Sequence, residues 1–387
     1  MKEDILEIKD EVIALRRHFH QYPEASLKEY KTAAKIKEEL DKLNISYETI
    51  GETGVLGVIQ GGLGEGKTVL LRADIDALEL NDDKEVAYKS KNKGLNHACG
   101  HDGHTAALLG AARILKKRQS LFKGTVKLAF QQAEEIGAGG RLFVQAGALK
   151  DVDGVFGIHL DSSVEVGKLV SVPGATNASC DIVKIVVHGK SSHVAAPHLG
   201  IDALATAASI IVEAQKIVSR QTSPLESVVV GFGVLNAGTR YNIVANRAEI
   251  EGTVRAFSHE SRAQVLESLK KIAENIAESH GASIEFEVYD AAAPLINDEE
   301  SAKFGAKIAE KIVGKENVIT NFPKSLGADD FADFLAEVPG VYGRVGTKNH
   351  ENPDTHYAHH HNQFDIDEES LLLATQFHTQ YALDYLS

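Results

Sequence analysis

The segment between residues 97 and 104 constrains this chain more than any other. It reads His-Ala-Cys-Gly-His-Asp-Gly-His, and so places three imidazoles, a thiol and a carboxylate within eight residues. Each of these groups is a possible ligand for zinc, manganese, cobalt or nickel. The two glycines permit the backbone turns that let neighbouring side chains share one site. We expect the rest of the chain to supply further ligands, a base and the walls of a site.

The length and charge of the chain exclude several classes of protein. Its 387 residues fit two domains. The net charge of −14 argues against nucleic acid or an anionic membrane surface as a partner. The first residues contain no apolar signal-peptide core, and no run of about 18 apolar residues predicts a membrane span. Two cysteines do not make a disulfide framework. We therefore expect a cytoplasmic enzyme.

Three apolar segments that read as strands each deliver acidic or imidazole side chains at the carboxyl end. In α/β sheets, functional sites are built at the carboxyl ends of the strands. The expected strands, each with the residues that it delivers, are 68–73 with Asp74 and Asp76, 125–131 with Glu134 and Glu135, and 155–159 with His159. Either aspartate alone could serve only as a turn cap, but three such strands together with the histidine cluster predict a site.

The pattern of the chain changes near Cys180, and the first pattern resumes after Pro294. Between these points the order of expected elements is β-α-β-β-α-β, which is typical of a ferredoxin-like module of about 110 residues. The expected elements are a strand at 181–187, a helix at 200–219, strands at 226–234 and 243–257, a helix at 260–278 and a strand at 282–288. We predict an α/β protein in which residues 180–289 are inserted into a discontinuous domain of residues 1–179 and 290–387.

The two adjacent glutamates suit the hydrolysis of an amide bond. This reaction requires deprotonation of water, polarisation of the carbonyl and protonation of the leaving nitrogen. Because successive side chains of an extended segment diverge, one of Glu134 and Glu135 can bind a metal while the other stays free as the base. Candidate ligands are then Cys99, His101, Glu135, His159 and a histidine of the segment 355–361.

Motifs spread over nearly the whole chain resemble those of the M20 metallopeptidase family. Within the family they are most similar to the amidohydrolase branch, with its N-acyl-amino-acid, hippurate and auxin-conjugate hydrolases and N-acetyldiaminopimelate deacetylases. The motifs are Arg16-Arg17-His18-Phe19-His20, Arg72-Ala73-Asp74-Ile75-Asp76-Ala77-Leu78, the segment 97–104, Gln131-Gln132-Ala133-Glu134-Glu135, Gly157-Ile158-His159, Gly189-Lys190-Ser191-Ser192-His193, Gly252-Thr253-Val254-Arg255 and the segment 360–368.

The resemblance implies a two-metal hydrolase with a mixed-sheet catalytic domain. The positions that match metal ligands are Cys99, His101, Glu135, His159 and His360. One ligand, expected to be the Cys99 thiolate, would bridge two divalent ions, either zinc, manganese, cobalt or nickel. Glu134 matches the general base, and Asp76 matches the carboxylate that orients a metal ligand.

The resemblance also assigns roles to the inserted module, which it identifies as a dimerisation domain. His193 matches an imidazole that a dimer partner supplies to the oxyanion. Asn242 and Arg255 match positions that meet the substrate carbonyl and its free carboxylate, for which the guanidinium is a bidentate donor. The expected protein is a homodimer that cleaves N-acyl amino acids by attack of a metal-activated water.

Several alternatives stay open at the level of the sequence. His356, His359 and His361 compete with His360, although the register set by Phe364 favours His360. Arg255 could instead pair with an acid on its own sheet. A dipeptidase or aminopeptidase could use the same site on short peptides, and a metal-binding protein without catalysis is the alternative from another class. The presence of Glu134, which no structural metal site requires, argues against a metal-binding protein without catalysis.

Overall fold

The computed structural model describes residues 1–387, which form two compact units. One unit comprises Met1–Gly174, Ile296–Pro323 and Asp329–Ser387, and the other comprises Ala175–Leu295 and Lys324–Ala328. The second unit is therefore an insertion in the first, although its boundaries lie a few residues outside 180–289. None of the helices combines the length and the apolar character needed to cross a membrane.

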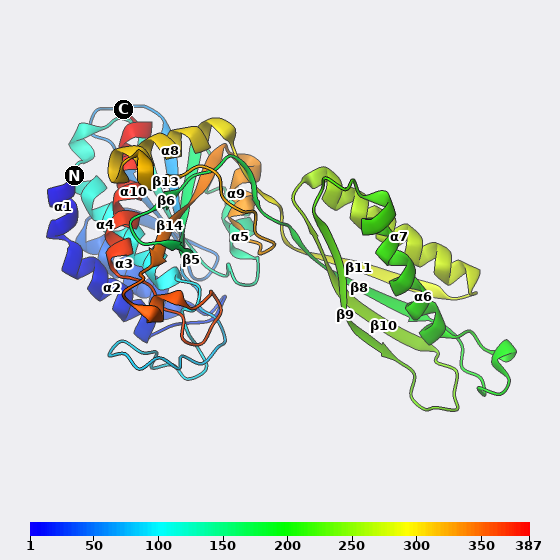
Figure 1. The fold of residues 1–387 in the computed structure, drawn as a ribbon. Coiled ribbons are helices and arrows are strands. Elements are labelled where there is room, and N and C mark those ends of the chain that lie inside the picture. Colours follow the sequence, from blue (N-terminus) through cyan, green and yellow to red (C-terminus); the bar gives the residue numbers. More distant parts are fainter. The chain divides into compact units, whose positions relative to one another are not determined.

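The first unit is built on an eight-stranded mixed sheet with the strand order β1-β2-β4-β3-β5-β14-β6-β13 (Figure 1). The central strands β4, β3, β5 and β14 are parallel to one another, whereas β2 is antiparallel to β4. The strands are β1 (Ser46–Ile50), β2 (Gly54–Gln60), β3 (Thr68–Asp74), β4 (Thr125–Gln131), β5 (Gly154–Glu165), β6 (Leu169–Val170), β13 (Val318–Ile319) and β14 (Gly340–Lys348). Parallel pairing brings the carboxyl ends of the central strands to one edge of the sheet, because the strands run in the same direction.

Helices cover both faces of this sheet. On β5, Phe156 packs against Phe377 of α10, while the next residue, Gly157, lies against Phe331 of α9. Successive residues of a strand point to opposite faces, so these two helices cover opposite sides. The helices of this unit are α1 (Lys2–Glu7), α2 (Lys9–Gln21), α3 (Tyr30–Lys42), α4 (His101–Lys117), α5 (Gly139–Gln145), α8 (Glu299–Val313), α9 (Phe331–Glu337) and α10 (Glu369–Tyr385).

The helix α4 carries the end of the histidine cluster into the core. Fourteen of its seventeen residues are buried, and it packs against α2, α10 and β3. A helix that is apolar on all sides is stable only when other elements surround it, which explains its alanine-rich and leucine-rich sequence. The preceding Gly100 has a φ of +91°, in the left-handed region that glycine adopts without strain. The cluster is thereby held rigidly beside the sheet edge.

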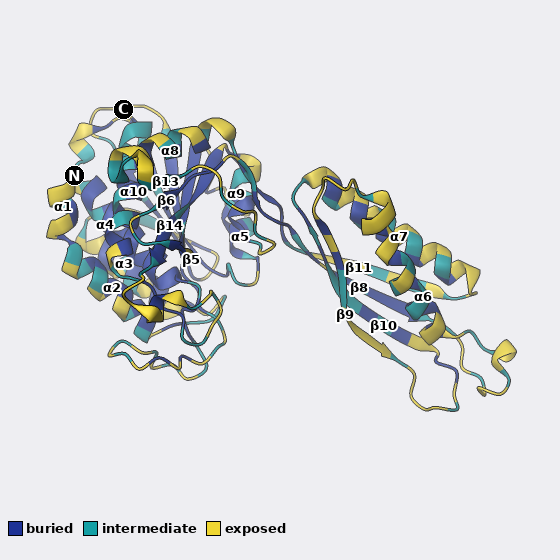
Figure 2. Cartoon of the chain, in the orientation of Figure 1, coloured by how far each residue is buried: buried dark blue, intermediate teal, exposed yellow.

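The second unit is an antiparallel four-stranded sheet of order β11-β8-β10-β9, covered by two helices. The elements are β8 (Cys180–His188), α6 (Ala203–Lys216), β9 (Val228–Ala237), β10 (Arg247–Ala256), α7 (His259–Ser279) and β11 (Ser283–Ala292). Their order is the predicted β-α-β-β-α-β order of a ferredoxin-like module. The short strands β7 (Gly174–Asn177) and β12 (Leu295–Asn297) pair with each other. Figure 2 shows α7 with a largely exposed outer surface.

The fold class predicted from the sequence is confirmed, but one expected strand begins later than predicted and one strand was not predicted. Residues 243–246 were expected to begin a strand, but they form a loop in which Val244 N–H donates to Ser192 O at 2.9 Å. The apolar alternation there reflects packing of the loop and not a strand. The edge strand β1 was not predicted, because most of its side chains are exposed and its pattern carries little apolar signal.

Candidate metal centre

The carboxyl edge of the large sheet gathers the residues that the sequence analysis singled out in the first unit. Asp74 ends β3, Glu134 and Glu135 follow β4, and His159 lies in β5. Three groups of side chains in this region could each hold a cation, because their ligand atoms lie within 4.8 Å of one another. They are Cys99, His101 and Glu135; Cys99, His159 and His359; and Asp74, His101 and His104.

Both ring nitrogens of His101 have defined roles. The Nδ1 atom lies 3.0 Å from the backbone oxygen of Asp76 and 3.3 Å from its Oδ1 atom. Because a carbonyl oxygen can only accept, Nδ1 carries a proton, and Nε2 is the ring atom that could bind a metal. The Nε2 atom is buried without a hydrogen-bond partner. This is the arrangement of a metal-ligating histidine whose second nitrogen is held by a carboxylate and a carbonyl.

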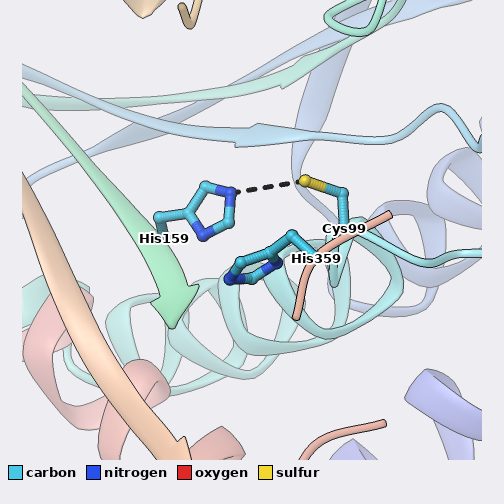
Figure 3. Close-up of side chains that lie close together, drawn as sticks. All are labelled: Cys99, His159 and His359. Atoms are coloured by element: carbon cyan, nitrogen blue, oxygen red, sulfur yellow. Dashed lines mark hydrogen bonds between the residues drawn. The ribbon is translucent and has the colours of Figure 1, made fainter. Parts of the chain in front are cut away.

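His159 is arranged in the same way and also lies beside Cys99. Its Nδ1 atom donates to the backbone oxygen of Leu160 at 2.8 Å, so its Nε2 atom is again free to bind. That Nε2 atom lies 3.5 Å from the Sγ atom of Cys99 (Figure 3). Cys99 therefore belongs to two of the three candidate groups, which is the position that a bridging ligand would occupy.

Glu135 and His360 complete the first group. The Nε2 atom of His360 lies 3.4 Å from Oε2 of Glu135, and the Nε2 atom of His101 lies 3.9 Å from Oε1. The Oε1 atom is buried and has no hydrogen-bond partner. Since buried polar atoms are nearly always paired, two orphaned ligand atoms that face each other indicate room for a cation. A thiol, imidazoles and a carboxylate are a donor set that zinc, cobalt and nickel accept.

Burial alters the proton affinity of the acidic members of this site. It raises the pKa of the Cys99 thiol well above its usual value and raises the pKa of Glu135 to about 7. Burial also raises the pKa of Glu134 well above its usual value, and the charges of Asp329 and Glu135 act in the same direction. A divalent cation would supply the positive charge that these groups lack.

Glu134 does not join the ligand groups through Cys99 but faces a second set of carboxylates. Oxygen atoms of Glu134, Asp329 and Asp330 lie within 4.8 Å of one another. Asp329 accepts from the hydroxyl of Tyr342 at 2.6 Å, and Asp330 accepts from Arg72 Nη2 at 3.0 Å. The two aspartates are thus partly neutralised, whereas Glu134 Oε2 has only His101 Nε2, at 3.8 Å, as an ionic neighbour.

Comparison with known proteins places this arrangement in one family. Residues 70–384 match the model of peptidase family M20/M25/M40. The chain belongs to peptidase family M20/M25/M40. It is accordingly a hydrolase that acts on amide bonds.

Relatives of the M20 family whose names give different activities resemble the whole chain. Thermostable carboxypeptidase 2 of Saccharolobus solfataricus is 38% identical over 100% of this chain and 98% of its own length. N-acetyl-L-cysteine deacetylase of Bacillus subtilis is 39% identical over 96% of this chain and 87% of its own. The crystal structure of Bacillus subtilis YxeP, a dinuclear metal binding peptidase of the M20 family, is 34% identical and superposes with a TM-score of 0.85, covering 98% of this chain and 99% of YxeP.

A buried network behind the M20 site was not predicted as a unit. The backbone N–H of Leu160 donates to Nε2 of His104 at 2.9 Å, so Nδ1 of His104 carries the proton and donates to Asp74 Oδ1 at 2.6 Å. Arg72 Nη1 donates to the other oxygen of Asp74 at 2.7 Å. The only sign of this network in the sequence is Arg72, a charged residue within an otherwise apolar strand. The network connects β3, α4 and β5 directly beside the candidate ligands.

The remaining predicted site residues lie in the second unit. His193 is exposed, and its neighbour Val194 donates from its N–H to the backbone oxygen of Asn242 at 3.2 Å. The Oδ1 atom of Asn242 is buried without a partner. Arg255 Nη1 donates to the backbone oxygen of Leu326 at 3.2 Å. The structure thus brings His193 and Asn242 onto adjacent loops.

Proposed function

We propose that this M20 hydrolase is a two-metal amidohydrolase that releases a free amino acid and a carboxylate from an N-acyl amino acid. The observation that carries the proposal is the position of Glu134. Its carboxylate lies next to the ligand groups, 3.8 Å from His101 Nε2, and no lysine or arginine pairs with it in an ion pair. A site that only stored a metal would not require this group.

The metal ligands in this proposal are Cys99, His101, Glu135, His159 and His360. If two divalent cations are bound by these residues, they would supply a Lewis acid for the amide carbonyl and would lower the pKa of an attacking water. The cysteine favours zinc, cobalt or nickel, and manganese remains compatible with the histidine and carboxylate ligands. Asp76 holds the ring of His101 through Nδ1 and keeps Nε2 directed at the site.

Glu134 serves as the general base and then as the general acid. It removes a proton from the attacking water and returns it to the amine that leaves. Burial, together with the charges of Asp329 and Glu135, raises the pKa of Glu134 above that of an exposed carboxyl group, which favours the protonated form that returns the proton to the amine. The neighbouring Glu135 is assigned to the metal, because its Oε1 atom is buried and has no hydrogen-bond partner.

The second unit contributes the residues that meet the substrate. His193 would donate to the oxyanion across a homodimer, with residues 180–289 acting as the dimerisation domain. Asn242 would contact the carbonyl, and Arg255 would bind the free carboxylate of the amino acid. The partially exposed guanidinium of Arg255 has only one hydrogen bond, to a backbone oxygen, and therefore keeps donors for a carboxylate.

Complementation between inactive variants tests the shared site. H193A and E134Q protein should each have low activity. After subunit exchange, mixed dimers should recover part of the activity, because one of their two sites then holds both intact residues. Exchange without recovery would contradict a site shared between subunits.

The names of the relatives favour two substrate classes with shared chemistry. The Bacillus relative is a deacetylase of N-acetyl-L-cysteine, and the Saccharolobus relative is a carboxypeptidase. In both classes the leaving nitrogen belongs to an amino acid with a free carboxylate, so the same Arg255 could serve either. Short peptides are therefore the second candidate, and dipeptidase or aminopeptidase activity belongs to this candidate.

A substrate panel on metal-reconstituted protein separates the candidates. Metal-free protein is loaded in turn with zinc, manganese, cobalt or nickel and offered N-acetyl and N-benzoyl amino acids, unblocked dipeptides and N-blocked dipeptides. We expect the highest kcat/KM on N-acyl amino acids. Higher kcat/KM on dipeptides with every metal would assign the protein to the peptidase class instead.

A further inference from the structure

Two adjacent histidines of the C-terminal segment are pinned beside Cys99. The backbone N–H of His360 donates to the backbone oxygen of Ala98 at 2.8 Å, so the peptide that joins residues 359 and 360 lies next to the segment 97–104. His360 has a φ of +65°, a left-handed conformation that strains a residue with a side chain. Such strain persists where the surrounding structure requires a particular placement of the side chain.

The two neighbouring imidazoles serve different groups. The ring of His360 lies at Glu135, as described above, whereas a ring nitrogen of His359 lies within 4.8 Å of Cys99 Sγ and of a ring nitrogen of His159. Figure 3 shows the side chains of Cys99, His159 and His359 gathered around one small space. The rings of His159 and His359 meet edge to face, with their centroids 4.8 Å apart.

One ring nitrogen of His359 has no hydrogen-bond partner. The Nδ1 atom is buried and has no hydrogen-bond partner. The Nε2 atom has a single contact at the limit of a hydrogen bond, 3.5 Å from the backbone N–H of Ser162. A histidine that served only to pack against Phe364, whose ring centroid is 4.8 Å away, would leave a buried polar atom unpaired, which is unfavourable. An aliphatic side chain would fill that space without the cost.

We propose that His359 is a metal ligand, which together with Cys99 and His159 holds one ion of the two-metal centre. His101, Glu135 and His360 then serve the other ion, with Cys99 common to both. This assignment rests on the proposed two-metal function and adds a sixth ligand to it. One thiolate and two imidazoles form a set suited to zinc, cobalt or nickel, and three protein ligands leave a fourth position open for a substrate atom.

Metal titration of the full-length chain tests this assignment without measuring turnover. Metal-free wild-type protein, H359Q and the exposed-site control H361Q are titrated with zinc in competition with a chromophoric chelator. His361 is a matched control because it lies in the same segment and stacks on Tyr357 away from Cys99. H359L, which fills the space with an apolar group, is the second variant in case H359Q does not fold. Circular dichroism and the thermal midpoint of the metal-free proteins report folding.

We expect wild-type protein and H361Q to bind two zinc ions per subunit. H359Q and H359L should bind one ion at least about tenfold more weakly and retain the other. Even a residue that only hydrogen-bonds to a metal ligand typically changes metal affinity by about tenfold or more. In cobalt-loaded protein, H359Q should change the visible absorption of one of the two ions. If His359 only packs against its neighbours, the spectrum should stay the same.

Two results would overturn the assignment, and they can be told apart. Folded H359Q or H359L that binds both ions with wild-type affinity and an unchanged cobalt spectrum would show that His359 only packs. Wild-type protein that binds fewer than two ions would overturn the two-metal centre itself, and the role of His359 with it.

Discussion

The carboxylate of Asp102, next to the candidate ligand His101, accepts a hydrogen bond from Arg16 Nε at 2.8 Å, and both side chains are fully buried. The same Oδ2 atom lies 2.7 Å from Nδ1 of His20. A second nitrogen of Arg16 donates to Asp365 at 2.6 Å. One guanidinium therefore connects α2, the start of α4 and the segment that follows His360, and it holds the parts of the site in register.

Removing this guanidinium should destabilise the first unit strongly. R16M leaves two buried carboxylates without a cation, which typically costs about 3–5 kcal/mol. The expected result is a large fall in the urea midpoint of metal-free protein. K9M removes the exposed pair of Lys9 with Glu369 and should leave the urea midpoint nearly unchanged, because exposed ion pairs contribute little to stability. Equal midpoints for R16M and K9M would contradict this role of Arg16.

Asp76 should control metal affinity through the orientation of His101. Its Oδ2 atom accepts from Ser26 Oγ at 2.6 Å and from the N–H of Glu135 at 3.1 Å, so its carboxylate also positions a second ligand. D76N should weaken zinc binding about 10–100-fold in a chelator competition assay. S26A, which removes one hydrogen bond and keeps the charge, should have a smaller effect. Unchanged affinity in D76N would exclude the positioning role.

Glu134 and Glu135 should separate catalysis from metal binding. E134Q removes the proton acceptor and should lower kcat by about 10²–10⁴-fold while two metal ions per subunit remain bound. E135Q is the matched variant, and it should lose metal as well as activity. Metal content by elemental analysis and the initial rate on an N-acyl amino acid measure the two effects. Substantial activity in E134Q would disprove the proposed mechanism.

Gly139 should be required for the conformation of the segment that carries both glutamates. A Cβ atom at this position would lie 1.6 Å from the backbone oxygen of Gln132. Backbone has to move to relieve this contact, so G139A should cost about 1–3 kcal/mol or more and reduce metal content. In G233A the new Cβ meets no atom within 4 Å. This control should keep wild-type metal content, and metal retention in G139A would contradict the prediction.

His378 should make the protein sensitive to acid. Burial lowers the pKa of its imidazole to about 3, and neither ring nitrogen has a hydrogen-bond partner. The unfolded chain takes up this proton near pH 6.5, so between about pH 6.5 and 3 the unfolded state binds more protons and the native state loses stability as the pH falls.

The variant H378L should remove this dependence. Relative to wild type, it should gain about 1.4 kcal/mol of stability for each pH unit below 6.5. Urea unfolding of metal-free protein at pH 7 and pH 5 measures the difference, and H198L at an exposed histidine is the control. Parallel pH profiles for wild type and H378L would contradict the buried-imidazole account.

The elements that could be predicted from the sequence are those with a strong local signal. The apolar runs of β3, β4 and β5 and the alanine-rich sequence of α4 extend over many residues, because these elements are buried on nearly all sides. The edge strand β1 was missed, because its exposed side chains show no apolar alternation. The loop 243–246 was predicted as strand, because side chains that pack in a loop can imitate that alternation. The cluster 97–104 and the paired glutamates were visible because they are contiguous in the chain.

The sequence by itself determined the family, the inserted module and the residue types of the candidate metal centre, since motifs and periodicity are local properties of the chain. Only the tertiary structure decided which of the neighbouring histidines faces which group. His359 and His360 are adjacent in sequence, and the left-handed backbone at His360 and its hydrogen bond to Ala98 direct them to different partners. Likewise, only folding brings Arg16 to Asp102. Contacts between distant segments depend on the packing of whole elements, which no local pattern encodes.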